Sequence, residues 1–303
     1  MKYTDSSTNI LDIMPSDFIY KGEHNYRTGT VYSGYIGNLA LSVTDHSVAL
    51  KQGSLCKWYL GSNCYTMNRV DTQNAIEALS DILHVPMQNA IVSRLDVGVN
   101  IITENDVTTY FPYLGELSRK QRLEQTNGLY YTTQTETLSF YDKIKEQIKT
   151  REPIPKEFRD KNVLRYEYRL KQRIAKKLGV EAVKASLLYD KVFYDNICYL
   201  LYEQYNKINK INILRPNIEA MKNKKEIDKY GNALLVEKLG GLNEAIKWVD
   251  VQRKNKVLTS LQATRMRANF REANNLSTNV MVRSKAIEEL DKKINDAIVL
   301  DRL

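Results

Sequence analysis

Apolar and polar residues alternate with a period of two along several stretches of the first 171 residues, which is typical of strands with one buried face. Gly, Asn and Asp residues separate these stretches. Asp71 is predicted to cap a helix over residues 72–83. A shorter helix is predicted after Thr103, where Asp106 completes a capping-box-like pair. The predicted strands cover residues 32–36, 39–44, 47–51, 90–102, 128–133, 136–142 and 162–171. This half of the chain is therefore predicted to be an antiparallel sheet flanked by helices.

After Lys171 the apolar residues recur every three or four positions, which predicts helices. The predicted helices cover residues 172–178, 180–189, 191–208, 226–239, 242–253, 257–273 and 284–300. Gly179 is a natural end for the first of them. We therefore predict an α+β domain over residues 1–178 and an all-helical domain over residues 179–303. No internal repeat is visible in the sequence.

The net charge of +9 is distributed unevenly. Residues 1–118 contain 7 Lys and Arg against 12 Asp and Glu, whereas residues 119–303 contain 38 against 24. A basic half favours a polyanionic partner, nucleic acid first, because neutralising phosphates releases counterions. The alternative is a solvated, lysine-rich helical surface.

Other classes of protein are excluded by what the sequence lacks. Three cysteines and three well-separated histidines rule out a disulfide framework, a four-cysteine zinc site and an HExxH metal site. No apolar run of about 18 residues predicts a transmembrane helix, and the first 30 residues do not resemble a secretory signal. We therefore expect an intracellular protein with no membrane partner.

Three predicted strands place polar side chains on a face where a buried strand would have apolar ones. These residues are Arg94, Asp96 and Asn100; Ser139, Tyr141 and Lys143; and Arg165, Glu167 and Arg169. If the strands are neighbours, two carboxylates could bind a divalent cation, a tyrosine could act as a nucleophile and the arginines could bind phosphate. The alternative is a solvated sheet face with cross-strand salt bridges.

Three blocks of this sequence resemble the phage and plasmid replication initiator family typified by the gene II protein of filamentous phages. They are Ser93–Asp96, Tyr141–Lys143 with Glu146, and Leu164–Leu170, in the order of the family. A weaker fourth block runs from Gly53 to Asn63. The blocks together cover about residues 30–190, and the helical tail is not covered.

The resemblance implies a rolling-circle nuclease-like catalytic domain that nicks and rejoins DNA at a replication origin. Tyr141 would be the nucleophile that forms a 5′-phosphotyrosine and frees a 3′-OH. Asp96 and Glu167 would hold Mg²⁺ or Mn²⁺. Arg94 and Lys143 would neutralise phosphate oxygens or brace the carboxylates.

The implied partners are origin DNA and the helicase and polymerase of a bacterial host, in whose cytoplasm the protein would act. The predicted DNA contacts are Lys57, Arg165, Arg169, Arg265, Arg267 and Arg271. The last three lie in the helical tail, where a glycine turn at residues 240–241 is loosely like a helix-turn-helix. Because the nucleophile block contains one tyrosine, holding two nicked strands would require a homodimer or a water-mediated step. The alternative functions are a relaxase for conjugative mobilisation and a non-catalytic nucleic-acid-binding protein.

Overall fold

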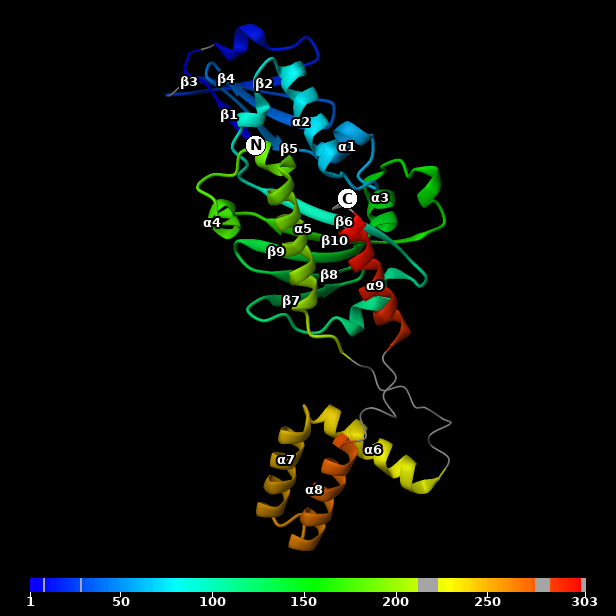
Figure 1. Ribbon diagram of the computed structural model, residues 1–303. Helices are drawn as coiled ribbons and strands as arrows, with labels where there is room; N and C mark the ends of the chain where they lie inside the picture. Colours follow the sequence, from blue (N-terminus) through cyan, green and yellow to red (C-terminus); the bar gives the residue numbers. More distant parts are fainter. Residues whose placement is uncertain (8, 28, 212–222, 276–283, 301–303) are drawn as a thin grey trace. The chain divides into compact units, whose positions relative to one another are not determined.

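The computed structural model describes the chain except for residues 8, 28, 212–222, 276–283 and 301–303 (Figure 1). The chain divides into two compact units, residues 1–209 with 289–303 and residues 210–288. The fold is α+β with a helical C-terminal region, as predicted. The predicted boundary at residue 179 lies inside the first unit, because helix α5 (Lys191–Asn206) packs against a sheet of that unit.

The first sheet, called sheet A, is antiparallel with the strand order β1-β5-β4-β3-β2. Its strands are β1 (Lys2–Thr4), β2 (Ile19–Tyr26), β3 (Gly29–Ile36), β4 (Leu39–Thr44) and β5 (Ser47–Gln52). One face of sheet A is buried, because Leu41, Val43 and Val48 are at most 2% exposed. Strands β1 and β2 were not predicted, whereas the other three were.

Helices α1 (Leu55–Leu60) and α2 (Arg69–Leu83) follow sheet A in the chain. The predicted cap of α2 is wrong by three residues. Asn68 caps the helix and Asp71 completes a capping box with it, because each side chain accepts a hydrogen bond from the backbone N–H of the other residue. The 3-10 helices η1 (Ile10–Ile13) and η2 (Met87–Asn89) complete this region.

The second sheet, called sheet B, is also antiparallel and has the order β6-β10-β9-β8-β7. Its strands are β6 (Leu95–Thr103), β7 (Gln121–Gln125), β8 (Gly128–Thr132), β9 (Glu136–Asp142) and β10 (Asn162–Leu170). Each sheet therefore pairs its first strand with its fifth and then continues with the fourth, third and second. This repeated topology was not visible in the sequence.

Shorter elements connect the strands of sheet B and lead on from it. They are η3 (Val107–Tyr113), α3 (Lys143–Thr150), η4 (Lys156–Phe158), α4 (Ile174–Leu178) and η5 (Ala185–Tyr189). Asp106 caps η3, since its side chain accepts from the Thr108 N–H, so this helix begins three residues later than the predicted start after Thr103.

Helices α5 and α9 (Lys285–Leu300) cover one face of sheet B (Figure 1). Phe140 and Tyr166 stack there with ring centroids 4.7 Å apart, and Tyr205 of α5 packs on both rings. The Tyr205 hydroxyl donates to Asp291 of α9 at 2.5 Å. Because this face forms the core of the unit, the opposite face of sheet B is left to the polar side chains.

The second unit contains helices α6 (Lys224–Lys238), α7 (Leu242–Lys254) and α8 (Ser260–Asn275). A small core holds the three together and consists of Val236, Ala245, Val249, Ala263 and Phe270. Gly240 and Gly241 have φ angles of 90° and 101°, so the turn between α6 and α7 requires a conformation that glycine adopts without strain. No helix in the described parts of either unit is long and apolar enough to cross a membrane.

Candidate functional site

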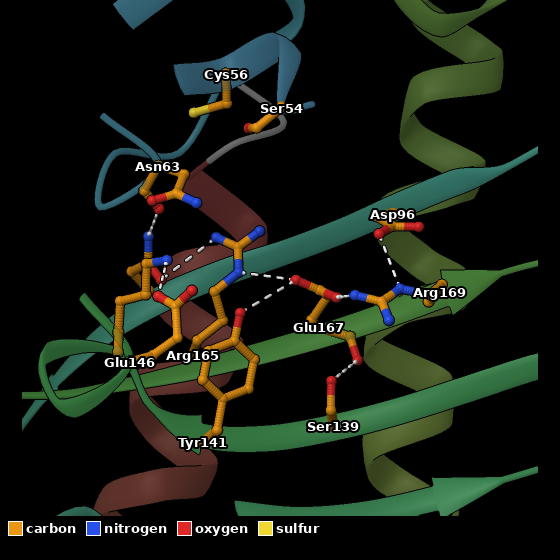
Figure 2. Close-up of polar contacts among 12 residues, drawn as sticks. Ser54, Cys56, Asn63, Asp96, Ser139, Tyr141, Glu146, Arg165, Glu167 and Arg169 are labelled. Carbon is orange, nitrogen blue, oxygen red and sulfur yellow. Dashed lines mark hydrogen bonds and ion pairs between the residues drawn. The ribbon is translucent and has the colours of Figure 1, made fainter. Parts of the chain in front are cut away.

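The polar residues of three neighbouring strands lie on one face of sheet B (Figure 2). In the central strand β10, Arg165, Glu167 and Arg169 point to this face. Their cross-strand partners are Asn100, Gly98 and Asp96 on β6 and Tyr141, Ser139 and Thr137 on β9. The three strands that carry these polar residues are therefore neighbours in sheet B. We call this surface the polar face of sheet B.

Arg169 bridges the two carboxylates of the polar face. Its Nε donates to Asp96 Oδ2 at 2.9 Å, and its Nη2 donates to Glu167 Oε1 at 2.8 Å. Arg94 binds both oxygens of Asp96, at 2.9 and 2.7 Å. Burial opposes ionisation of Asp96, but the hydrogen bond from Arg94 and the charge of Arg169 hold its pKa below the ordinary value. Asp96 is therefore anionic at neutral pH.

Tyr141 points toward the other side of Glu167. Its hydroxyl donates to Glu167 Oε2 at 3.4 Å, and Arg165 Nε donates to the same oxygen at 3.2 Å. Burial, followed by the negative charge of Glu167, raises the pKa of Tyr141 well above its ordinary value, although the charge of Arg165 lowers it. The phenol is thus protonated in the free protein, with Glu167 as an acceptor for its proton.

The loop after α1 forms one wall of the site. Arg165 donates to Asn100 Oδ1 at 3.3 Å, and Asn100 Nδ2 donates to the carbonyl oxygen of Cys64 at 2.7 Å. The Cys56 thiol is close enough to feel the charges of Arg165 and Lys143, although burial is the larger effect and raises its pKa. The weak sequence block over residues 53–63 therefore lies beside the main blocks (Figure 2).

Lys143 begins helix α3 and is almost completely buried, with a side chain 1% exposed. Its Nζ lies 2.7 Å from Glu146 Oε2. Gln147 donates to the same oxygen at 3.1 Å and to Asn63 Oδ1 at 2.8 Å. The side chain of Lys143 thus pairs with Glu146 instead of reaching open solvent.

The sequence did not predict two of these contacts. Asn100 of β6 and Gln147 of α3 each bind the loop after α1, at Cys64 and Asn63, across 36 and 84 residues of chain. Alternation placed Asn100 on the polar face, and the weak fourth block includes Asn63. Gln147 carries no pattern that distinguishes it from a surface amide.

A second tyrosine lies on the polar face of sheet B. Tyr130 of β8 is the cross-strand partner of Ser139, and Gly128 is the partner of Tyr141. A Cβ atom added to Gly128 would lie 2.7 Å from the Tyr130 hydroxyl, so the Tyr130 ring leans along β8 toward Tyr141. Tyr130 differs from Tyr141 because its hydroxyl makes no hydrogen bond with Glu167 in the described contacts.

The remaining predicted DNA contacts are on helices α1 and α8. Lys57 of α1 pairs with Glu152 at 2.5 Å. In α8, Arg267 pairs with Asp250 at 2.5 Å, whereas Arg265 and Arg271 are exposed. Arg265 and Arg271 are therefore the tail arginines best placed to meet a ligand.

Asp96 and Glu167 carry the oxygen ligands that Mg²⁺ and Mn²⁺ prefer. Each of their four carboxylate oxygens, however, accepts a hydrogen bond from an arginine. Among the described residues, no group of three His, Cys, Asp or Glu side chains could hold a metal ion. Because Arg169 lies between the two carboxylates and binds both, their oxygens are not free to bind a cation in this arrangement. The metal site predicted from the sequence stays a prediction.

Comparison with known proteins gives one finding. A family model that describes the N-terminal region of the phage replication-associated protein, the gene II protein, matches residues 19–187, which is more than half of the chain. The matched segment includes β6, β9 and β10, and therefore the whole of the polar face of sheet B. A search of curated proteins found no match.

Proposed function

Because the chain belongs to the family of the phage replication-associated gene II protein, we propose that it nicks and rejoins one DNA strand at a rolling-circle origin, with Tyr141 as the nucleophile. Membership of the family supports a role in initiating phage-type replication. It also supports a DNA-nicking activity in general terms, without specifying the nucleophile. The observation that carries the proposal is the Tyr141 hydroxyl within reach of Glu167, on a face with three arginines.

In the nicking step, Tyr141 Oη attacks the scissile phosphorus. An Oη–P bond forms and the O3′–P bond breaks, which leaves a 5′-phosphotyrosine and a 3′-OH. The phenol proton passes to Glu167, and the leaving 3′ oxygen takes up a proton from the solvent, to which the attacking 3′-OH returns one in the joining step. Arg165 and Arg169 stabilise the charge on the transferring phosphate, because guanidinium groups bind phosphate oxygens in a fixed geometry.

In the joining step, a 3′-OH attacks the phosphotyrosine and releases Tyr141. One phosphodiester replaces another in each direction, so no ATP is required. Glu167 accepts the proton in the first step and returns it to Tyr141 in the second. Lys143 and Glu146 fix the first turn of α3, since Lys143 pairs with Glu146 and Gln147 links Glu146 to Asn63.

Some parts of the proposal rest on the family and not on this chain's geometry. Mg²⁺ or Mn²⁺ would assist phosphate transfer by polarising the scissile phosphate. The host polymerase would extend the freed 3′-OH, with the host helicase as a further partner. A homodimer would supply the second nucleophile that a two-strand intermediate needs.

The test is a supercoiled plasmid carrying the cognate origin, incubated with the protein and either Mg²⁺ or Mn²⁺. Wild-type protein yields open circles with protein on the 5′ end, whereas Tyr141→Phe yields none and still binds DNA. Tyr130→Phe is the matched control, because it removes a tyrosine hydroxyl from the same face and leaves the hydrogen bond between Tyr141 and Glu167 intact. This variant nicks like the wild type.

Two results contradict the proposal in different ways. If Tyr141→Phe nicks normally, the nucleophile is another residue. If the wild-type protein shifts the plasmid in a gel and never cuts it, the chain is a DNA-binding protein without the reaction.

A further inference from the structure

Sheet A has the same strand order as sheet B, so each face of one sheet has a counterpart on the other. In sheet B, the face away from α5 carries the proposed nicking site. In sheet A, the face with Leu41 and Val43 is buried, and α2 lies beside the sheet (Figure 1). The opposite face, which we call the open face of sheet A, is the counterpart of the polar face of sheet B.

The open face of sheet A is hollowed, with a cavity volume of about 560 Å³. Its floor consists of small side chains, among them Ser33 and Ser42, which are cross-strand partners. None of the lining residues is acidic. The lining of the hollow therefore lacks the carboxylates of its counterpart, and it can bind a ligand without the same chemistry.

Aromatic and basic side chains surround this floor. Tyr26 is 61% exposed and Tyr35 is 41% exposed, and both line the hollow. Lys21 and Lys51 line it as well, and Lys21 Nζ lies 6.0 Å from the centre of the Tyr35 ring. Exposed aromatic rings beside cationic groups on an open antiparallel sheet are the combination that binds unpaired nucleotides.

The chemistry of these groups selects among ligands. Tyrosine rings can stack only on bases that are unpaired, since the bases of a duplex already stack on one another. Lysine ammonium groups attract phosphates at any sequence. A protein partner with an apolar surface would leave the lysines and the serine floor without partners.

We propose that the open face of sheet A binds single-stranded DNA, with bases stacked on Tyr26 and Tyr35 and phosphates on Lys21 and Lys51. This surface would hold the unpaired origin strand next to the segment that is cut on sheet B. The inference rests on the proposed function for the identity of the strand, and the contacts themselves are independent of the reaction.

The test uses the full chain with Tyr141→Phe and a fluorescein-labelled oligothymidylate, measured by fluorescence anisotropy. Tyr26→Ala and Tyr35→Ala each weaken binding by about fivefold or more, because stacking of one base contributes on this scale. Lys21→Gln and Lys51→Gln each lower the slope of log K against log salt by about 0.7. With a bromodeoxyuridine oligonucleotide, ultraviolet cross-links map to peptides that contain Tyr26 or Tyr35.

Tyr20→Ala is the matched control. Tyr20 is on the same strand β2 and is 53% exposed, but its ring lies near Tyr32, with ring centroids 6.4 Å apart, and it does not line the hollow. This variant binds oligothymidylate like the parent. Lys191→Gln on α5 is the control for charge, because Lys191 is exposed and does not line the hollow.

The outcomes separate this inference from the proposed function. If Tyr26→Ala and Tyr35→Ala bind like the parent, or if oligouridylate RNA binds more tightly than the DNA, the inference is wrong even when the wild type nicks its origin. If these variants bind more weakly while the wild type fails to nick, the strand-binding surface stands and the nicking proposal falls.

Discussion

Arg169 donates to Asp96 on β6 and to Glu167 on its own strand β10, so one guanidinium contacts both carboxylates. This arrangement sets the charge of the site before any ligand arrives. With Asp96 and Glu167 ionised and Arg94, Arg165 and Arg169 charged, the cluster has one more positive than negative charge. A phosphate is therefore attracted to the polar face even though two carboxylates lie on it.

The pKa of Asp96 provides a prediction with a definite sign. In the folded chain this pKa lies below 3.8, in spite of burial, through Arg94 and Arg169. As the pH falls through this range, the unfolded chain takes up the proton first, so the stability that Asp96 contributes above pH 3.8 is lost on acidification. Arg169→Gln should raise the Asp96 pKa, as measured by carbon NMR of the carboxyl group. Arg173→Gln, which alters an exposed arginine, should not change it.

A second prediction concerns the divalent cation. Because Arg169 occupies one oxygen of each carboxylate, Arg169→Gln should increase Mn²⁺ affinity in the DNA-free protein, measured by the decrease of the free Mn²⁺ signal in electron paramagnetic resonance. Asp96→Asn in the same background should remove this gain. If Mn²⁺ binds the wild type tightly and Asp96→Asn leaves that binding unchanged, the ligands lie elsewhere.

At the scale of elements, the sequence predicted a strand correctly where alternation of apolar and polar residues was bounded by turn residues. Strand β4 was predicted to the residue over Leu39–Thr44, and β9 over Glu136–Asp142. Strand β7 (QRLEQ) was missed because it is polar and is stabilised by pairing with β8, and the exposed edge strand β2 was missed for the same reason. Pairing of this kind depends on tertiary structure and leaves no local signal.

For the candidate site, the residues were predictable from the sequence, whereas their contacts across strands were not. Alternation assigned Asp96, Tyr141 and Glu167 to polar faces of their strands, and family resemblance selected them as a group. The strand register that brings Arg165 opposite both Asn100 and Tyr141 could not be derived from one sequence. Neither could the bridging role of Arg169, because it depends on the distance between two strands.

The close approach of β6 and β10 leads to a prediction for Gly98. A Cβ atom at this position would lie 2.5 Å from the Tyr166 carbonyl oxygen and 2.9 Å from Glu167 Cα, so backbone would have to move. Gly98→Ala should lower the free energy of unfolding by roughly 1–3 kcal/mol and slow nicking, because Glu167 shifts with its strand. Gly22→Ala is the control, since nothing lies within 4 Å of its Cβ position. Equal urea midpoints for Gly98→Ala and wild type would contradict the expected clash.

At the scale of the whole molecule, the charge follows the division into units. Residues 210–288 contain 16 Lys and Arg against 8 Asp and Glu, and so carry +8 of the net charge of +9. The unit with the proposed nicking site is therefore nearly neutral. Long-range attraction to duplex DNA belongs mainly to the three-helix unit, because that attraction depends on net charge.

The last prediction separates the two units by function. Arg265→Gln with Arg271→Gln removes two exposed charges of α8 and should weaken binding of duplex origin DNA, with the slope of log K against log salt reduced by about 0.9 for each phosphate that is no longer neutralised. Nicking of the supercoiled plasmid should slow, whereas cleavage of a short single-stranded oligonucleotide with the same nick sequence should not change, because that reaction needs only the polar face of sheet B. Arg267→Gln is the control: it breaks the ion pair with Asp250 and should lower the thermal stability of the three-helix unit more than it changes the salt slope. If oligonucleotide cleavage falls as much as plasmid nicking in the double variant, the helical unit takes part in the reaction itself and the division of labour is wrong.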